Sequence, residues 1–215
     1  MFLLALVVTF ANWGGVALAQ TPNATPLRLA VLGDSLTAGY GLPVSAAFPV
    51  RLQQALKDKG IVTDIVNAGV SGDTASGGRD RLDWSIPQGT QAVIVELGAN
   101  DMLRGVDPKV TRAALDEIVQ RLKARGIEVM LCGMYAAPNL GGTYGQAFNS
   151  IYPDLAKKYG VALYPFFLDG VVDSKTLKQA DGLHPTAAGV DVIVQRILPS
   201  VEAFVKKLPP VQAAL

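Results

Sequence analysis

Two short polar segments of the sequence carry residues that could do chemistry together. Gly33-Asp34-Ser35 supplies a serine hydroxyl, and Asp181-Gly182-Leu183-His184 supplies a carboxylate and the only histidine of the sequence. A serine hydroxyl becomes an effective nucleophile when an adjacent base takes its proton, and imidazole is the most frequent base. Ser35 and His184 are therefore the candidate nucleophile and base of an acyl-transfer reaction.

Such a reaction also needs a group that orients the base and donors that stabilise an oxyanion. Asp181 precedes His184 by three residues, close enough to accept a hydrogen bond from the second ring nitrogen and fix the tautomer. The candidate oxyanion donors are the N–H groups of Ser35 and Gly72 and the side-chain amide of Asn100. One such donor lowers a barrier by about 3–4 kcal/mol.

Each of these motifs also has a purely structural interpretation. Gly33-Asp34-Ser35 could form a turn after a strand, a lone histidine is more often structural than catalytic, and Asp181 and Asn100 could be ordinary turn residues. Asp34 and Asp101 have no required part in proton transfer, and we expect structural hydrogen bonds from both.

The hydrophobic pattern predicts alternating strands and helices that could bring these residues together. We expect strands at 27–32, 61–66, 92–97, 127–132 and 161–164, and helices at 45–59, 75–84, 107–125, 144–159 and 186–207. This alternation predicts an α/β fold with a parallel sheet between helix layers. The carboxyl ends of parallel strands meet at one edge, so the segments around Ser35, Gly72 and Asn100 should converge. His184 reaches them only if the loop 165–182 folds over that edge.

Several residues are assigned to the core rather than to the site. Cys132 lies in an apolar run and is predicted to be a small buried hydrophobe. The pair Phe166-Phe167 is also predicted to be core. The helix at 107–125 should bury a stripe that runs along one face, made of Val110, Ala114, Ile118 and Leu122.

Composition limits the possible functions. The sequence has 215 residues, a formal net charge of +1 and well-mixed charges, so it lacks the basic patch of a nucleic-acid-binding protein. One cysteine excludes an intrachain disulfide and a multi-cysteine metal site. The length is that of a single domain.

The N-terminus differs from the rest of the sequence. Residues 1–19 are uncharged and mostly apolar, and they end in Ala17-Leu18-Ala19, which is typical of a secretory signal cleaved after Ala19. No Lys or Arg follows Met1, and an uncleaved membrane anchor is the alternative. The predicted organisation is a signal at 1–19, a leader at 20–26, a domain at 27–208 and a tail at 209–215.

The four polar segments together resemble the sequence blocks of the GDSL, or SGNH, hydrolases. Gly33-Asp34-Ser35-Leu36 is similar to the nucleophile block, Gly72 and Asn100 to the glycine and asparagine blocks, and Asp181 with His184 to the Asp-x-x-His block. The subgroup of small secreted thioesterases, lysophospholipases and arylesterases is most similar, although this chain has Gly98-Ala99 where a Gly-Gly pair is typical there.

This resemblance implies a flavodoxin-like three-layer α/β/α sandwich with a five-stranded parallel sheet. It also implies hydrolysis of esters or thioesters, no metal, no cofactor and a periplasmic or secreted location. The loop 134–141 is expected to border the acyl pocket, although it could be an ordinary surface loop. The expected substrate contacts are Tyr135, Ala136, Pro138, Asn139 and Leu140.

The predicted function is therefore a serine esterase that acts through a covalent acyl-enzyme. A carbohydrate O-acetyl esterase of the same fold and a non-catalytic periplasmic binder of esters or lipids are the alternatives. The expected partner is a small-molecule ester or thioester. We expect no nucleic-acid partner, no stable membrane insertion after removal of the signal, and a monomer.

Overall fold

Five apolar segments form one parallel sheet in the computed structural model, which describes residues 25–208. The strands are β1 (Leu27–Gly33), β2 (Thr63–Gly69), β3 (Ala92–Glu96), β4 (Glu128–Cys132) and β5 (Ala162–Tyr164). Their order across the sheet is β2-β1-β3-β4-β5, and every neighbouring pair is parallel. This is the flavodoxin-like order, in which the winding direction reverses between β1 and β3.

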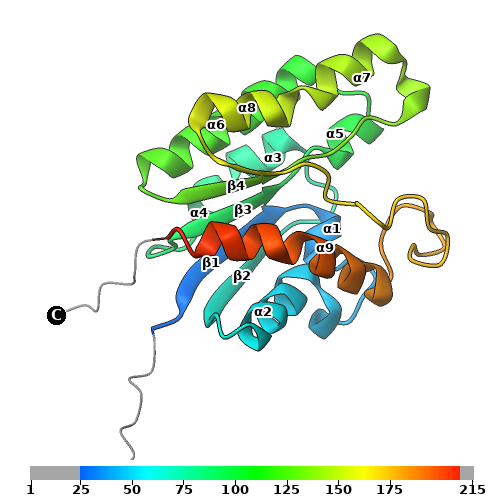
Figure 1. Cartoon of the computed structure of the whole chain (residues 1–215). Helices are drawn as coiled ribbons and strands as arrows, with labels where there is room; N and C mark the ends of the chain where they lie inside the picture. The colour runs from blue at the N-terminus through cyan, green and yellow to red at the C-terminus, as the bar shows by residue number, and fades with distance from the viewer. Residues whose placement is uncertain (1–24, 209–215) are drawn as a thin grey trace, which may run out of the picture.

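Helices cover both faces of the sheet (Figure 1). The helices α2 (Phe48–Asp58) and α9 (Ala187–Val205) pack against each other on one face, and α3 (Ala75–Asp80), α6 (Pro108–Ala124) and α8 (Ile151–Tyr159) lie on the other. The shorter helices are α1 (Ser35–Ala38), η1 (Val44–Ala46), α4 (Leu82–Ser85), α5 (Ala99–Leu103), η2 (Pro138–Leu140) and α7 (Gly142–Asn149). The predicted three-layer α/β/α fold is confirmed.

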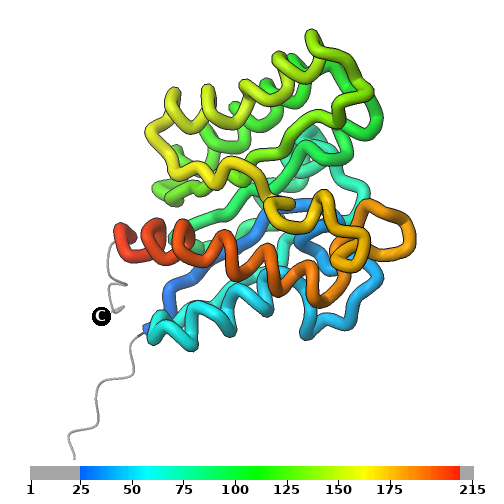
Figure 2. The backbone as a smooth tube through the Cα atoms, turned by 45° about the vertical axis from the view of Figure 1, so that its right-hand side comes forward, coloured from blue at the N-terminus to red at the C-terminus, as the bar shows by residue number. Residues whose placement is uncertain are grey.

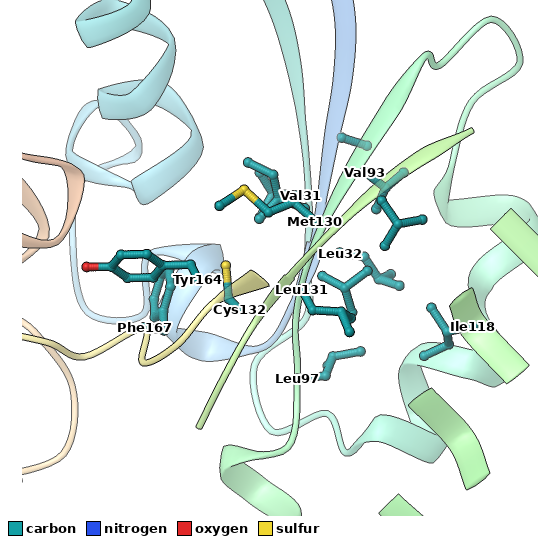
Figure 3. Close-up of a cluster of buried hydrophobic side chains, with 14 of the residues drawn as sticks. Val31, Leu32, Val93, Leu97, Ile118, Met130, Leu131, Cys132, Tyr164 and Phe167 are labelled. Carbon is teal, nitrogen blue, oxygen red and sulfur yellow. The ribbon is translucent and has the colours of Figure 1, made fainter. Parts of the chain in front are cut away.

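The central strands supply side chains to both layers of the core (Figure 3). Along β4, Met130 lies on the side of the sheet that faces Phe167, while Leu131 lies on the side that faces Ile118 of α6. These four residues are all at most 1% exposed. Strands that are covered on both faces need apolar residues at every position, and this explains their near-continuous hydrophobic runs. Cys132 is buried, as predicted.

Several predicted helices are divided in the structure. Instead of one helix at 45–59 there is a short 3-10 turn and then α2, because Ala47 is extended and Pro49 occupies the first turn of α2. The helix predicted at 144–159 is two helices separated at Ser150, and that predicted at 75–84 is α3 followed by α4. The second strand begins and ends later than predicted, at Thr63–Gly69.

The buried stripe of α6 begins one residue later than the sequence pattern indicated. Val110 is 49% exposed, whereas Thr111 is fully buried. The Thr111 hydroxyl donates to Asp101 Oδ1 at 2.9 Å, so the first turn of α6 packs through a hydrogen bond rather than through an apolar side chain.

The predicted signal at 1–19, most of the leader and the tail at 209–215 lie outside the described residues. Within residues 25–208, no helix combines the length and the apolar character needed to cross a membrane.

Candidate active site

The candidate nucleophile stands at the end of the central strand β1. The strand ends at Gly33, Asp34 caps the short helix α1, and Ser35 is the first residue of that helix. The Asp34 carboxylate accepts the Leu36 N–H at 2.9 Å, which satisfies one of the free donors at the start of the helix. Ser35 is 9% exposed, so its hydroxyl group is held at the bottom of a depression rather than on an open loop.

The segments that follow β2 and β3 meet this turn, as the sequence analysis predicted. Asn100 lies in α5, directly after β3, and its side-chain Nδ2 donates to Asp34 Oδ2 at 3.0 Å. Gly72 follows β2 on the other side of β1. The site therefore lies beside the point between β1 and β3 where the sheet reverses its winding, which is where open α/β sheets bind their ligands.

The loop between β5 and α9 folds over the same edge and brings the histidine to the serine. His184 Nε2 lies 2.9 Å from Ser35 Oγ, and Nδ1 lies 2.6 Å from Asp181 Oδ2. The second oxygen of Asp181 accepts the N–H groups of Leu183 and His184 at 2.9 and 3.0 Å. These hydrogen bonds, first of all the one to His184, lower the pKa of Asp181 from 3.8 to about 2.

Two residues that the sequence analysis did not single out hold this loop in place. Gln179 Nε2 donates to the carbonyl groups of Tyr40 and Pro185 at 2.8 and 2.9 Å, and its backbone N–H donates to His184 O. The Tyr40 ring packs on the His184 ring, with 4.5 Å between centroids. Figure 2 shows the loop, in yellow to orange, reaching back over the blue segment that follows β1.

The three candidate oxyanion donors differ in their hydrogen bonding. In the described part of the chain, the backbone N–H groups of Ser35 and Gly72 donate to no acceptor. By contrast, both hydrogens of Asn100 Nδ2 are engaged, one by Asp34 Oδ2 at 3.0 Å and one by Asp73 O at 2.9 Å. Gly72 has a φ of +85°, a conformation that favours glycine.

The other carboxylates near the site make structural contacts. Asp73 forms an ion pair with Arg81 at 2.5 Å. Asp101 is fully buried and accepts the Ala75 N–H and the Thr111 hydroxyl. Within residues 25–208, no three His, Cys, Asp or Glu side chains are grouped in a way that could hold a metal ion.

An apolar cavity adjoins the serine. A small pocket of about 180 Å³ contains Ser35, Asn100 and His184, and it shares much of its wall with a neighbouring cavity of about 380 Å³. The shared residues are Met102, Leu103, Met134, Leu168 and Leu183. The two cavities therefore lie side by side, and hydrophobic side chains form the wall that they share.

The loop that was predicted to border this cavity does so only in its first half. Tyr135, Ala136 and Pro138 line the cavity. Asn139 and Leu140, the last two residues of η2, do not line it; Asn139 is exposed and Leu140 is partly exposed.

The core assignment of the Phe166-Phe167 pair holds fully for Phe167 and only in part for Phe166, which packs against the core but also faces the cavity. Its ring lines the cavity and stacks on Tyr135, with 4.7 Å between centroids, whereas Phe167 is fully buried in the core. The sequence pattern of two adjacent aromatic residues did not indicate which of them faces the cavity.

Comparison with known proteins agrees with this geometry. The sequence profile of the GDSL-like lipase/acylhydrolase family matches residues 31–192, which contain the whole site. The chain belongs to this family. It is similar to the esterase TesA of Pseudomonas aeruginosa, with 38% identity over 85% of this chain and 91% of that protein.

Other members of the GDSL family show similar agreement. Thioesterase 1/protease 1/lysophospholipase L1 of Escherichia coli is 43% identical over 73% of this chain and 74% of that protein. The crystal structure of AlinE4, an SGNH-hydrolase family esterase, covers 86% of this chain and 98% of its own, with 44% identity and a TM-score of 0.72. The family resemblance expected from the four sequence blocks is thus confirmed.

Proposed function

We propose that this protein is a serine esterase in which Ser35 is the nucleophile, His184 the general base and Asp181 the residue that orients His184. The observation that carries the proposal is the unbroken hydrogen-bonded chain from Ser35 Oγ to His184 Nε2 and from Nδ1 to Asp181. The names of its relatives, which include esterases and a thioesterase, support ester or thioester bonds as the target.

In the proposed reaction, His184 Nε2 takes the proton of Ser35 as the hydroxyl oxygen attacks the acyl carbon. Asp181 is ionised at every pH well above 2, so it accepts the Nδ1 proton and stabilises the imidazolium that forms. His184 then gives the proton to the leaving alcohol or thiol. In the second half-reaction, water attacks the acyl-enzyme with His184 again acting as base.

Gly72 and Ser35 are the proposed primary oxyanion donors because their N–H groups have no acceptor elsewhere in residues 25–208. Asn100 contributes if it shares one of its engaged hydrogens with the oxyanion in a three-centre bond. Its existing bonds to Asp34 and Asp73 keep the amide in place before substrate arrives, and such preorganisation is what makes oxyanion donors effective.

The apolar cavity favours substrates whose acyl chain is longer than acetyl. Its walls are hydrophobic side chains, including the stacked pair of Tyr135 and Phe166, and burial of each methylene group contributes about 0.8 kcal/mol. We propose that Tyr135, Ala136 and Pro138 contact the acyl chain. A carbohydrate O-acetyl esterase would gain little from this cavity, and the Ser35–His184 contact favours catalysis over simple binding.

Hydrolysis of p-nitrophenyl esters from acetate to laurate tests the proposal. We expect the wild type to hydrolyse the series and Ser35→Ala to lose activity by several orders of magnitude. The matched control is Ser45→Ala, because Ser45 is exposed and should leave the rates unchanged. Equal rates for the wild type and Ser35→Ala across the whole series would contradict the proposed mechanism.

We also propose that the protein is exported to the periplasm or secreted and acts as a monomer. The uncharged apolar segment 1–19 supports export. N-terminal sequencing of the protein purified from its native host should begin at Gln20, and sedimentation should give the mass of one chain. A mature protein that retains residues 1–19 would support a membrane anchor instead.

A further inference from the structure

Two carboxyl side chains are buried next to the turn that carries the candidate nucleophile. Asp34 and Glu96 are both 0% exposed. They lie at the ends of neighbouring strands: Glu96 is the last residue of β3, and Asp34 directly follows Gly33, the residue of β1 that is paired in register with Glu96. A Cβ atom on Gly33 would lie 3.0 Å from Glu96 Oε2. The Glu96 carboxyl group therefore packs against the turn that carries Asp34 and Ser35.

The two carboxyl groups differ in their hydrogen bonds. Each oxygen of Asp34 accepts one, from the Leu36 N–H and from Asn100 Nδ2. Neither oxygen of Glu96 has a hydrogen-bond partner within residues 25–208. The backbone N–H and the carboxyl group of Asp34 both face Glu96. The N–H lowers the pKa of Glu96, but burial and the charge of Asp34 raise it by more. A fully buried carboxylate with no hydrogen bond to either oxygen is very unfavourable, and such a group is neutralised by binding a proton.

We propose that Glu96 is protonated in the working enzyme and donates a hydrogen bond to the Asp34 carboxylate, so that the two side chains share one negative charge. Glu96 is then a positioning residue for the reaction of Ser35. It fixes Asp34, and Asp34 in turn holds the Asn100 amide and caps the helix α1 that begins with Ser35.

The electrostatic environment supports this arrangement. Burial, and then the charge of Asp34, raise the pKa of Glu96 well above its usual value, while burial raises the pKa of Asp34 to about 6. Five charged or titratable groups face the pair. They come from α5, from the loop 165–186 that carries His184 (the histidine loop), from α8, from β4 and from the end of α3, and they are Asp101, His184, Tyr152, Cys132 and Arg81.

None of these groups replaces the proton on Glu96. Burial raises the pKa of both Tyr152 and Cys132, so both stay neutral. Arg81, the cation beside the turn, donates to Gly33 O but is paired with Asp73. Within the described residues, then, no cation is paired with either carboxyl group of the Asp34–Glu96 pair, and two ionised carboxylates there would repel each other.

The protonation state of Glu96 can be measured directly in the wild-type protein. The sequence contains four glutamates, Glu96, Glu117, Glu128 and Glu202, and Glu96 is the buried one among them. In a protein labelled with ¹³C at the glutamate δ-carbon, we expect one carboxyl resonance to keep the chemical shift of a protonated acid at neutral pH. This resonance should be absent from Glu96→Gln. A wild-type spectrum at neutral pH without a protonated glutamate resonance would overturn the proposal.

Kinetics of two variants test the positioning role, which rests on the proposed esterase function. Glu96→Gln retains a donor to Asp34 and should keep a kcat close to that of the wild type. Glu96→Leu removes the donor and should lower kcat by roughly 10- to 100-fold, the loss expected for one hydrogen bond to a charged group, with little change in KM. Glu117→Gln, at a partly exposed, ion-paired position, is the control.

The outcomes separate this inference from the proposed function. Equal loss of kcat in Glu96→Gln and Glu96→Leu would contradict the donor role of Glu96. If the wild type instead had no serine-dependent esterase activity, the proposed function would fail, and the carboxyl resonances would still decide whether Glu96 is protonated.

Discussion

The two aspartates of the site lie in regions that are built in opposite ways. Asp34 follows a central strand, is fully buried, and has its pKa raised to about 6 by burial. Asp181 lies in the long loop before α9, its side chain is 37% exposed, and hydrogen bonds lower its pKa to about 2. The same type of side chain is thus a buried structural group in one region. In the other region it is a partly exposed, fully ionised hydrogen-bond acceptor.

This difference shows that two structurally different regions supply the groups of the candidate site. The strand ends fix the proposed nucleophile and the proposed oxyanion donors through the sheet, and that region is part of the core. The histidine loop carries the proposed base, which local hydrogen bonds hold in place, and contacts of Gln179 and Tyr40 attach the loop to the segment that follows β1. Substitutions in the two regions should therefore differ in their effects on kcat and on the pH dependence of stability.

The largest expected effect comes from removing the charge of the exposed aspartate. Asp181→Asn keeps an oxygen for the N–H groups of Leu183 and His184 but has no carboxylate to accept the Nδ1 proton. We expect kcat to fall by about 10³- to 10⁴-fold, because the Nδ1–H tautomer of His184 is no longer fixed and its imidazolium has no counter-ion. Steady-state kinetics with a p-nitrophenyl ester measures this loss, and Asp173→Asn in the same loop is the control. A loss below tenfold would show that Asp181 does not orient His184.

The buried aspartate should instead affect the pH dependence of stability. A folded-state pKa of about 6 for Asp34, against 3.8 unfolded, means that ionisation is disfavoured in the folded state. This contribution to stability is present below pH 3.8 and is lost as the pH rises through about 6, by about 3 kcal/mol in total.

Urea unfolding of the wild type and Asp34→Asn between about pH 4 and pH 7 tests this sign. The wild type should lose stability relative to the variant as the pH rises. A parallel pH dependence of the two proteins would show that Asp34 is not perturbed. For Asp181, whose pKa is lowered, the sign is opposite, and stability is lost as the pH falls from 3.8 through about 2.

Weakening the attachment of the histidine loop should lower kcat by an intermediate amount. Gln179→Leu removes the side-chain hydrogen bond that ties the loop to Tyr40 and a second one, to Pro185, that joins two parts of the loop. At about 1 kcal/mol for each bond, we expect kcat to fall by roughly 10- to 50-fold, together with faster proteolysis between residues 165 and 186. Gln195→Leu on the exposed face of α9 is the matched control. Unchanged proteolysis with normal kcat would show that other contacts hold the loop.

The smallest expected effect concerns the apolar cavity beside Ser35 that we propose holds the acyl chain, which is lined by residues of both regions. Ala136→Phe should fill part of the cavity, so that activity on laurate falls by about tenfold or more while activity on acetate changes little. Ala147→Phe, on the exposed surface of α7, should leave the ratio of the two rates unchanged. An equal decrease for both esters would place the acyl chain elsewhere.

Some features were predictable because they depend on neighbours in sequence. The strands could be located because a sheet that is covered on both faces needs continuous apolar runs, as in Ala92–Glu96. The pairing of Asp181 with His184 is a contact across three residues. Exact helix limits were less predictable, as the break at Ser150 and the exposure of Val110 show, because packing rather than periodicity decides them.

The sequence by itself determined the order of the strands and helices, the polar residues at the strand ends and the local Asp181–His184 pair. Only the tertiary structure decided that the histidine loop crosses the sheet edge, that Phe166 rather than Phe167 faces the cavity, and that Glu96 is buried beside Asp34 with no hydrogen bond to its carboxyl oxygens. These facts depend on contacts between residues far apart in the chain. They arise when the whole sheet and both helix layers pack together, and no local pattern records them.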